Sequence, residues 1–122
     1  MLVIKRTPGD CITIGNDIGI RVIAIRGNCV TLDIAAPAPA VVVRKDRAPS
    51  EQSVCVGDDV EIVMVGICGQ YVRVGIIAPK SMFVRRGSTH DSIPSGEQVN
   101  NAVMELRGPW SRDWAVEHIR ER

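Results

Sequence analysis

Histidine and cysteine are the residue types that most often carry catalysis or metal binding, and their spacing in this chain supports neither. The four cysteines form no CxxC pair and no Cys/His spacing that suits zinc; they are Cys11, Cys29, Cys55 and Cys68. His90 and His118 lack the neighbouring serine, cysteine or carboxylate pattern of general acid–base catalysis. No phosphate-binding glycine loop follows a strand and opens a helix. We therefore expect no enzymatic activity, no metal and no cofactor, with the cysteines reduced in core or edge positions.

The composition favours one β-rich domain with a balanced charge. Hydrophobic residues make up 45% of the 122 residues but aromatic residues only 3%, and the many valines and isoleucines pack well on a pleated sheet. The formal net charge of +1 excludes binding to nucleic acid by overall charge and leaves room for a local basic patch. No apolar run has the length of a signal peptide or a membrane span, so we expect a cytoplasmic protein.

The elements that must position any site come from an internal repeat of 42 residues. Residues 11–45 align with residues 53–87 without a gap, and many apolar positions exchange one aliphatic residue for another. The residues with an identical partner 42 positions later are Gly15, Asp17, Ile20, Ile25, Gly27, Val30, Ile34, Ala36, Pro37, Val42 and Arg44. Because so short a unit cannot bury its own apolar face, the two copies are expected to complete each other's core.

Turn signals and alternation divide each copy into short strands. The first copy (residues 1–46) predicts five strands, at residues 1–6, 11–14, 18–26, 30–34 and 40–45. The second copy (residues 53–86) predicts only four, at residues 53–56, 59–67, 71–77 and 81–86. Glycine with asparagine between two apolar runs, as at Gly27-Asn28, favours a tight hairpin. Where the first strand of the second copy should lie, residues 47–52 have the composition of a linker.

Residues 87–122 are expected to form a loop followed by a helical tail. Val99, Ala102, Val103 and Leu106 have helical spacing that ends at Gly108-Pro109, which predicts a helix. Ser111 can cap a second helix, whose apolar face would hold Trp114, Ala115 and Ile119. The tail carries four basic and six acidic residues, against eleven and eight in residues 1–86.

Three interpretations of the tail stay open. Its apolar residues can pack against the β core, or Trp110 and Trp114 can anchor a protein partner. The third follows from the missing strand: that sheet edge needs cover, and residues 87–122 can provide it.

Both copies resemble the CsrA/RsmA family of bacterial carbon storage regulators. In the first copy the likeness covers Met1-Leu2-Val3-Ile4 with Arg6, Gly9-Asp10, Ile14-Gly15, Gly27-Asn28, Ala36-Pro37 and residues 42–44. In the second copy it covers residues 57–60, Gly69-Gln70, residues 78–80 and residues 84–86. Each piece alone is common, whereas the collinear set, present twice, is specific.

The resemblance implies both a fold and a function. Members of the family are homodimers whose strands interleave, and each of two RNA sites pairs the first strand of one subunit with the fifth strand of the other. Their targets are GGA elements in mRNA leaders or in the hairpin loops of small RNAs. The expected fold is therefore an all-β core in which tandem CsrA-like units form an intramolecular strand-exchanged pseudo-dimer of mixed antiparallel sheets, with a C-terminal helical extension. The chain is expected to be a monomer that binds mRNA or a small regulatory RNA.

Mapped onto this chain, the resemblance implies one complete RNA site and one degraded site. The complete site joins the first strand to the end of the second copy, and its residues are Ile4, Lys5, Arg6, Val84, Arg85 and Arg86. The degraded site keeps Val42 and Arg44 but lacks a first strand. The family usually carries a second basic residue after Arg6, where this chain has Thr7.

Two alternatives compete with this interpretation. Arginines at strand ends often guard sheet edges against aggregation, and this applies most to Arg44. The chain can also be a protein-interaction module or an antagonist on a CsrA-like scaffold that has lost RNA binding.

Overall fold

The computed structural model describes residues 1–46, 52–96 and 98–107, and it assigns these residues to strands, turns and loops with no helix. The ten strands are β1 (Leu2–Arg6), β2 (Cys11–Ile14), β3 (Ile18–Arg26), β4 (Cys29–Pro37), β5 (Val42–Asp46), β6 (Gln52–Val56), β7 (Val60–Cys68), β8 (Tyr71–Ile77), β9 (Val84–Gly87) and β10 (Val99–Arg107). The first nine lie where the sequence predicts strands. The tenth lies where the sequence predicts a helix.

The same hairpin turn recurs in both copies. Gly27 joins β3 to β4 with a φ of 60°, and its repeat partner Gly69 joins β7 to β8 with a φ of 62°. A positive φ of this size is costly for residues with a Cβ atom, and glycine adopts it freely. The long hairpins β3–β4 and β7–β8 are therefore encoded locally by these turns.

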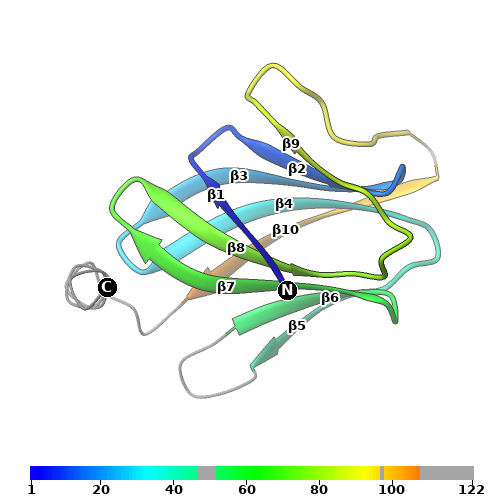
Figure 1. Cartoon of the computed structure of the whole chain (residues 1–122), viewed down its shortest axis with the longest axis horizontal. Helices are drawn as coiled ribbons and strands as arrows, with labels where there is room; N and C mark the ends of the chain where they lie inside the picture. Colours follow the sequence, from blue (N-terminus) through cyan, green and yellow to red (C-terminus); the bar gives the residue numbers. More distant parts are fainter. Residues whose placement is uncertain (47–51, 97, 108–122) are drawn as a thin grey trace.

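The strands form two five-stranded antiparallel sheets, and each sheet mixes strands from both copies (Figure 1). In the first sheet, β1 and β5 flank β8, β7 and β6 in the order β1-β8-β7-β6-β5. In the second sheet the order is β10-β4-β3-β2-β9. The outer strands of copy one, β1 and β5, thus pair with strands of copy two, and β9 of copy two pairs with β2 of copy one. The expected strand exchange takes place within one chain.

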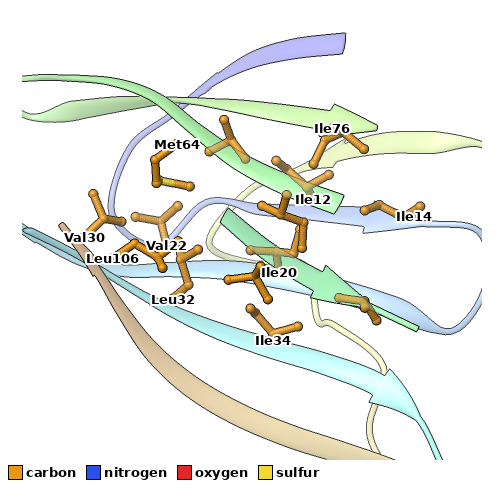
Figure 2. Close-up of a cluster of buried hydrophobic side chains, with 14 of the residues drawn as sticks. Ile12, Ile14, Ile20, Val22, Val30, Leu32, Ile34, Met64, Ile76 and Leu106 are labelled. Carbon is orange, nitrogen blue, oxygen red and sulfur yellow. The ribbon is translucent and has the colours of Figure 1, made fainter. Parts of the chain in front are cut away.

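The core lies between the two sheets and is almost entirely aliphatic (Figure 2). Alternation sends every second side chain of each strand inward, where Ile20, Leu32 and Ile34 of one sheet face Met64 and Ile76 of the other. The outer strands contribute as well, because Ile4 of β1 and Leu106 of β10 are fully buried. The two repeats therefore share a single core.

The helix predicted from Val99 to Leu106 is wrong, because this segment is strand β10. It pairs with β4 over nine residues, from Val99 opposite Pro37 to Arg107 opposite Cys29. The helical spacing was ambiguous, because some of its positions also fit one face of a strand. Ala102, Met104 and Leu106 recur at the period of two that a strand requires. The open edge of β4 offers backbone partners for the whole segment, and such tertiary context overrides a weak helix preference.

β10 occupies the edge that the missing first strand of copy two would leave open. The predicted second helix, with its cap at Ser111, and both Trp110 and Trp114 lie outside the described residues, as does most of the 47–52 linker. Among the residues that are described, no helix could span a membrane and no cluster of His, Cys, Asp and Glu could hold a metal ion.

Candidate functional site

Arg6 joins the edges of the two sheets at the predicted complete site. It lies opposite the buried Val72, so its side chain leaves β1 on the inner face of the sheet. Its Nη1 donates to the carbonyl oxygen of Gly87 at 2.8 Å and to that of Cys11 at 3.4 Å. Its Nε donates to the carbonyl oxygen of Lys5 at 2.7 Å. The end of β1 is therefore tied to the end of β9, although 81 residues separate Arg6 from Gly87.

The two arginines of β9 point to opposite faces. Arg86 pairs with the buried Ile12 and so lies on the inner side, next in the chain to the carbonyl that holds Arg6. Arg85 pairs with Thr13 and lies on the outer face. Both arginine side chains are exposed. Alternation thus gives β9 one basic group on each side of the sheet edge.

Lys5 lies on the outer face of β1. Its Nζ sits 4.3 Å from the centroid of the Tyr71 ring, a cation–π geometry that keeps an exposed ammonium group over β8. The other two residues of the predicted site have structural roles, since Ile4 is buried in the core and Val84 is half-buried against it. The basic groups of the site are therefore Lys5, Arg6, Arg85 and Arg86.

The opposite edge of the molecule has the same architecture with β10 in place of β1. Ala102 of β10 pairs with Ile34 as Leu2 of β1 pairs with Ile76, and Ile34 and Ile76 are partners in the repeat. At the other end, Leu106 pairs with Val30 as Arg6 pairs with Val72. The two strands thus sit in equivalent positions and in the same register.

A hydrogen bond at the strand end repeats too. The Asp10 carboxylate accepts from the backbone N–H of Thr7 at 3.0 Å, and the side-chain oxygen of Gln52, the repeat partner of Asp10, accepts from the backbone N–H of Arg107. The tail strand therefore reproduces the way that β1 ends.

Equivalent positions on β1 and β10 carry different chemistry. Glu105 stands where β1 has Lys5, and the buried Leu106 stands where β1 has Arg6. Arg107 adds a positive charge where β1 is followed by Thr7. On β5, Arg44 is exposed opposite Val54 and Val42 is half-buried against the core, so both residues of the predicted degraded site match their partners on β9. This edge keeps the arginine of the fifth strand and loses the basic pair of the first.

Asp10 carries a perturbed carboxyl group close to the site. The backbone N–H of Thr7, helped by the Thr7 hydroxyl and by Arg6 and Arg21, holds the pKa of Asp10 below its ordinary value. Because the folded pKa lies below the unfolded one, this contribution to stability is complete above the unfolded value, about 4. It is lost as pH falls through the lower, folded pKa.

Replacing Thr7 with valine is expected to raise the pKa of Asp10 towards its ordinary value without reaching it. The substitution removes the hydroxyl, which donates to Asp10 Oδ2 at 2.8 Å, and keeps the backbone N–H, the larger cause of the shift. An NMR titration of the Asp10 carboxyl carbon in both proteins measures this. An unchanged pKa in Thr7→Val would contradict the role of the hydroxyl.

Cys11 behaves as the sequence suggests for a structural thiol. It is buried, its Sγ lies 3.8 Å from the carbonyl oxygen of Ser88, and burial raises its pKa. A raised pKa lowers the thiolate fraction at neutral pH, which disfavours a role as a nucleophile or metal ligand.

The sequence did not point to several groups that shape this edge. The carbonyl of Gly87 and the carboxylate of Asp10 act through backbone contacts, which leave little trace in residue type. Arg21 reaches from β3 to the carbonyl oxygen of Asp91 and holds the segment after β9 against the sheet. Tyr71 could have been found, because the expected strand exchange places β1, which carries Lys5, beside β8.

Comparison with known proteins gives matches over both copies. The model of the CsrA family, described as a global regulator protein family, matches residues 1–48 and again residues 47–94. The translational regulator CsrA of Caldicellulosiruptor bescii is 52% identical over 44 residues, which are 36% of this chain and 56% of that protein. CsrA of Exiguobacterium sibiricum is 46% identical over 46 residues, which are 38% of this chain and 61% of that protein. The matched segment therefore spans less than two thirds of these curated relatives, and no solved structure matches the chain significantly.

Proposed function

Because the chain belongs to the CsrA family, as a tandem of two units, we propose that it is an RNA-binding regulator of translation. Its target is a GGA element in an mRNA leader or in the hairpin loop of a small RNA. The relatives reported above are named translational regulators. The proposal places the protein in the cytoplasm, where mRNA is translated.

The observation that carries the proposal is the link between Arg6 and the end of β9. It brings the basic residues of β1 beside Arg86 at an open sheet edge. Within the described part of the chain, every hydrogen bond of Arg6 uses Nε or Nη1, so Nη2 is available to a ligand. The exposed Arg86 can present its planar fork to the O6 and N7 acceptors of guanine, and unpaired loop bases expose these edges.

We propose one such site per chain. At the edge formed by β5 and β10, Glu105 would repel phosphate and Leu106 offers no donor to a base. Arg44 and Arg107 remain there, but this edge has no counterpart of Arg6 to join β10 to β5. The asymmetry between the two ends of the molecule supports one functional site.

We also propose that the protein acts as a monomer. Each position that a partner's strand fills in a strand-exchanged dimer is filled here by a strand of the same chain. A linker at residues 47–52 would give the second copy a high effective concentration near the first. Size-exclusion chromatography with light scattering tests this directly, and a dimer would contradict it.

A gel-shift titration against a hairpin that displays GGA in its loop, with a hairpin in which GGA is disrupted, tests the function. Binding that requires GGA supports the proposal. Equal binding of both hairpins would contradict sequence recognition. No shift at micromolar protein would favour a protein-interaction module on the same scaffold.

Binding is expected to weaken steeply with salt. If about three of the four basic groups contact phosphates of unpaired RNA, the slope of log Kobs against log salt is about −2, which is roughly a 16-fold loss between 50 and 200 mM salt. Fluorescence anisotropy at several salt concentrations measures the slope. A slope near zero would contradict phosphate contacts.

A further inference from the structure

Phe83 is the most exposed large apolar side chain in the described part of the protein. Its exposed fraction is 79%, although its backbone is fixed: the carbonyl oxygen of Phe83 accepts from the N–H of Gly15 at 2.7 Å. This bond continues the β2–β9 ladder one residue beyond Val84. Phenylalanine is usually buried, and here its ring stands in solvent on an ordered backbone, where it offers a flat surface for stacking.

Arg85 lies two residues further along the same edge, on the same outer face as Phe83 by strand alternation. It lines an open cleft of about 550 Å³ together with side chains that can form hydrogen bonds. Those side chains include Thr13, Asn16, Ser92 and Ser95. An exposed ring, a guanidinium group and a polar cleft thus follow one another along the outer face.

The wall of this cleft is a packed part of the structure. Ile93 and Pro94 cross β3 so closely that a Cβ atom on Gly19 would lie 2.6 Å from Ile93 Cβ and from Pro94 Cδ. The turn before them is held because Ser88 N–H donates to Asp91 Oδ2 at 2.7 Å. Glycine at position 19 is therefore what allows the segment to lie against the sheet.

The other half of the molecule lacks this combination. Val41 and Val43 are the repeat partners of Phe83 and Arg85, and they line a cleft that is mostly apolar. Lys45, at the rim of that cleft, stands where β9 ends in Gly87. Of these two pairs of repeat partners, only Phe83 and Arg85 combine a ring with a guanidinium group, and they lie in the half that also carries Lys5 and Arg6.

We propose that Phe83, Arg85 and the adjoining cleft bind a single-stranded nucleotide that flanks the GGA element. The base stacks on the Phe83 ring, a phosphate pairs with Arg85, and the hydroxyls and amide of the cleft meet the sugar or the base edge. Stacking on an aromatic side chain accepts any base, so this subsite adds affinity and not sequence preference. The inference rests on the proposed function and extends the RNA footprint to the outer face of β9.

The test compares two RNAs and a set of variants by fluorescence anisotropy. One RNA is a hairpin that carries only the GGA loop, and the other has unpaired nucleotides on both sides of GGA. Phe83→Ala is expected to weaken binding of the extended RNA roughly tenfold and to leave the affinity for the short hairpin unchanged. Phe83→Trp keeps a stacking surface and is expected to restore binding, whereas Phe83→Leu is not.

Val41→Ala is the matched control, because Val41 is 62% exposed at the equivalent position of the other half. It is expected to change neither affinity. Equal binding of the extended RNA by wild type and Phe83→Ala would overturn the subsite, and binding of the short hairpin would then show that the GGA site survives. Failure of every GGA RNA to bind would overturn both proposals.

A fluorescent base analogue such as 2-aminopurine in the flank gives a second readout. Stacking on Phe83 is expected to change its emission in the wild-type complex and not in the Phe83→Ala complex. The same emission change in both complexes would contradict stacking at this ring.

Discussion

Replacing Leu106 with alanine is expected to lower the free energy of unfolding by about 2–5 kcal/mol, the usual cost of a buried leucine. Leu106 is the fully buried residue that β10 contributes to the shared core, and Met104 packs against that core beside it (Figure 2). The loss has two sources: the side chain's transfer free energy and the cavity that alanine leaves between the sheets. Urea denaturation followed by circular dichroism measures the effect.

Val103→Ala is the control for this prediction. Val103 lies on the same strand, is 69% exposed and faces away from the core. Surface substitutions of this kind usually change stability by less than about 0.5 kcal/mol. Equal losses from the two variants would show that β10 does not pack as the structure has it.

Affinity separates the structural role of β10 from the RNA site. Under conditions where Leu106→Ala remains folded, its affinity for a GGA hairpin is expected to equal that of the wild type, because the site uses β1 and β9. A large loss of RNA binding in the folded variant would contradict this assignment.

The nine strands of the repeat could be predicted because their signals are local. Glycine turns such as Gly27 and Gly69 set the hairpins, and alternating valine and isoleucine set the faces. The exchange of outer strands between copies was implied by resemblance, since nothing in the residues of β1 alone says that it pairs with β8. Pairing partners distant in sequence leave no local pattern.

The tenth strand could not be read correctly because its signal depends on context. Val99, Ala102 and Leu106 fit a helical stripe, and only the open edge of β4 decides for a strand. The missing strand in copy two was nevertheless the right clue, since it predicted an edge that needed cover. The sequence thus predicted which sheet edge needed cover, but not that a strand would cover it.

β10 replaces the backbone role of a first strand without its chemistry. A sheet edge asks only for hydrogen-bonding groups in register and for apolar side chains on the inner face, and β10 supplies both. The charges of β1 are not part of that requirement: Glu105 lies on the outer face where β1 has Lys5, and the buried Leu106 takes the inner position where β1 has Arg6. Fold symmetry and functional symmetry can therefore separate within one chain.

The second large effect is expected at Arg86. Arg86→Ala should weaken binding to a GGA hairpin by roughly 1–3 kcal/mol, the range for losing an arginine that contacts a base. Arg86 is a cleaner choice than Arg6, because its exposed side chain makes no hydrogen bond within the described part of the chain, whereas Arg6 ties β1 to Gly87. Arg6→Ala is expected to lose a similar amount of affinity and some stability as well.

Arg44→Ala is the matched control, since Arg44 is the repeat partner of Arg86 and is also exposed, on β5. Its affinity should stay close to wild type, because the neighbouring strand offers Glu105 and Leu106 in place of a lysine and an arginine. Isothermal titration calorimetry gives affinity and stoichiometry together, and one RNA per chain is expected. Equal losses at Arg44 and Arg86, or two RNAs bound per chain, would mean that the edge formed by β5 and β10 also binds RNA. The basic residues of a first strand, which β10 lacks, would then not be required for a site.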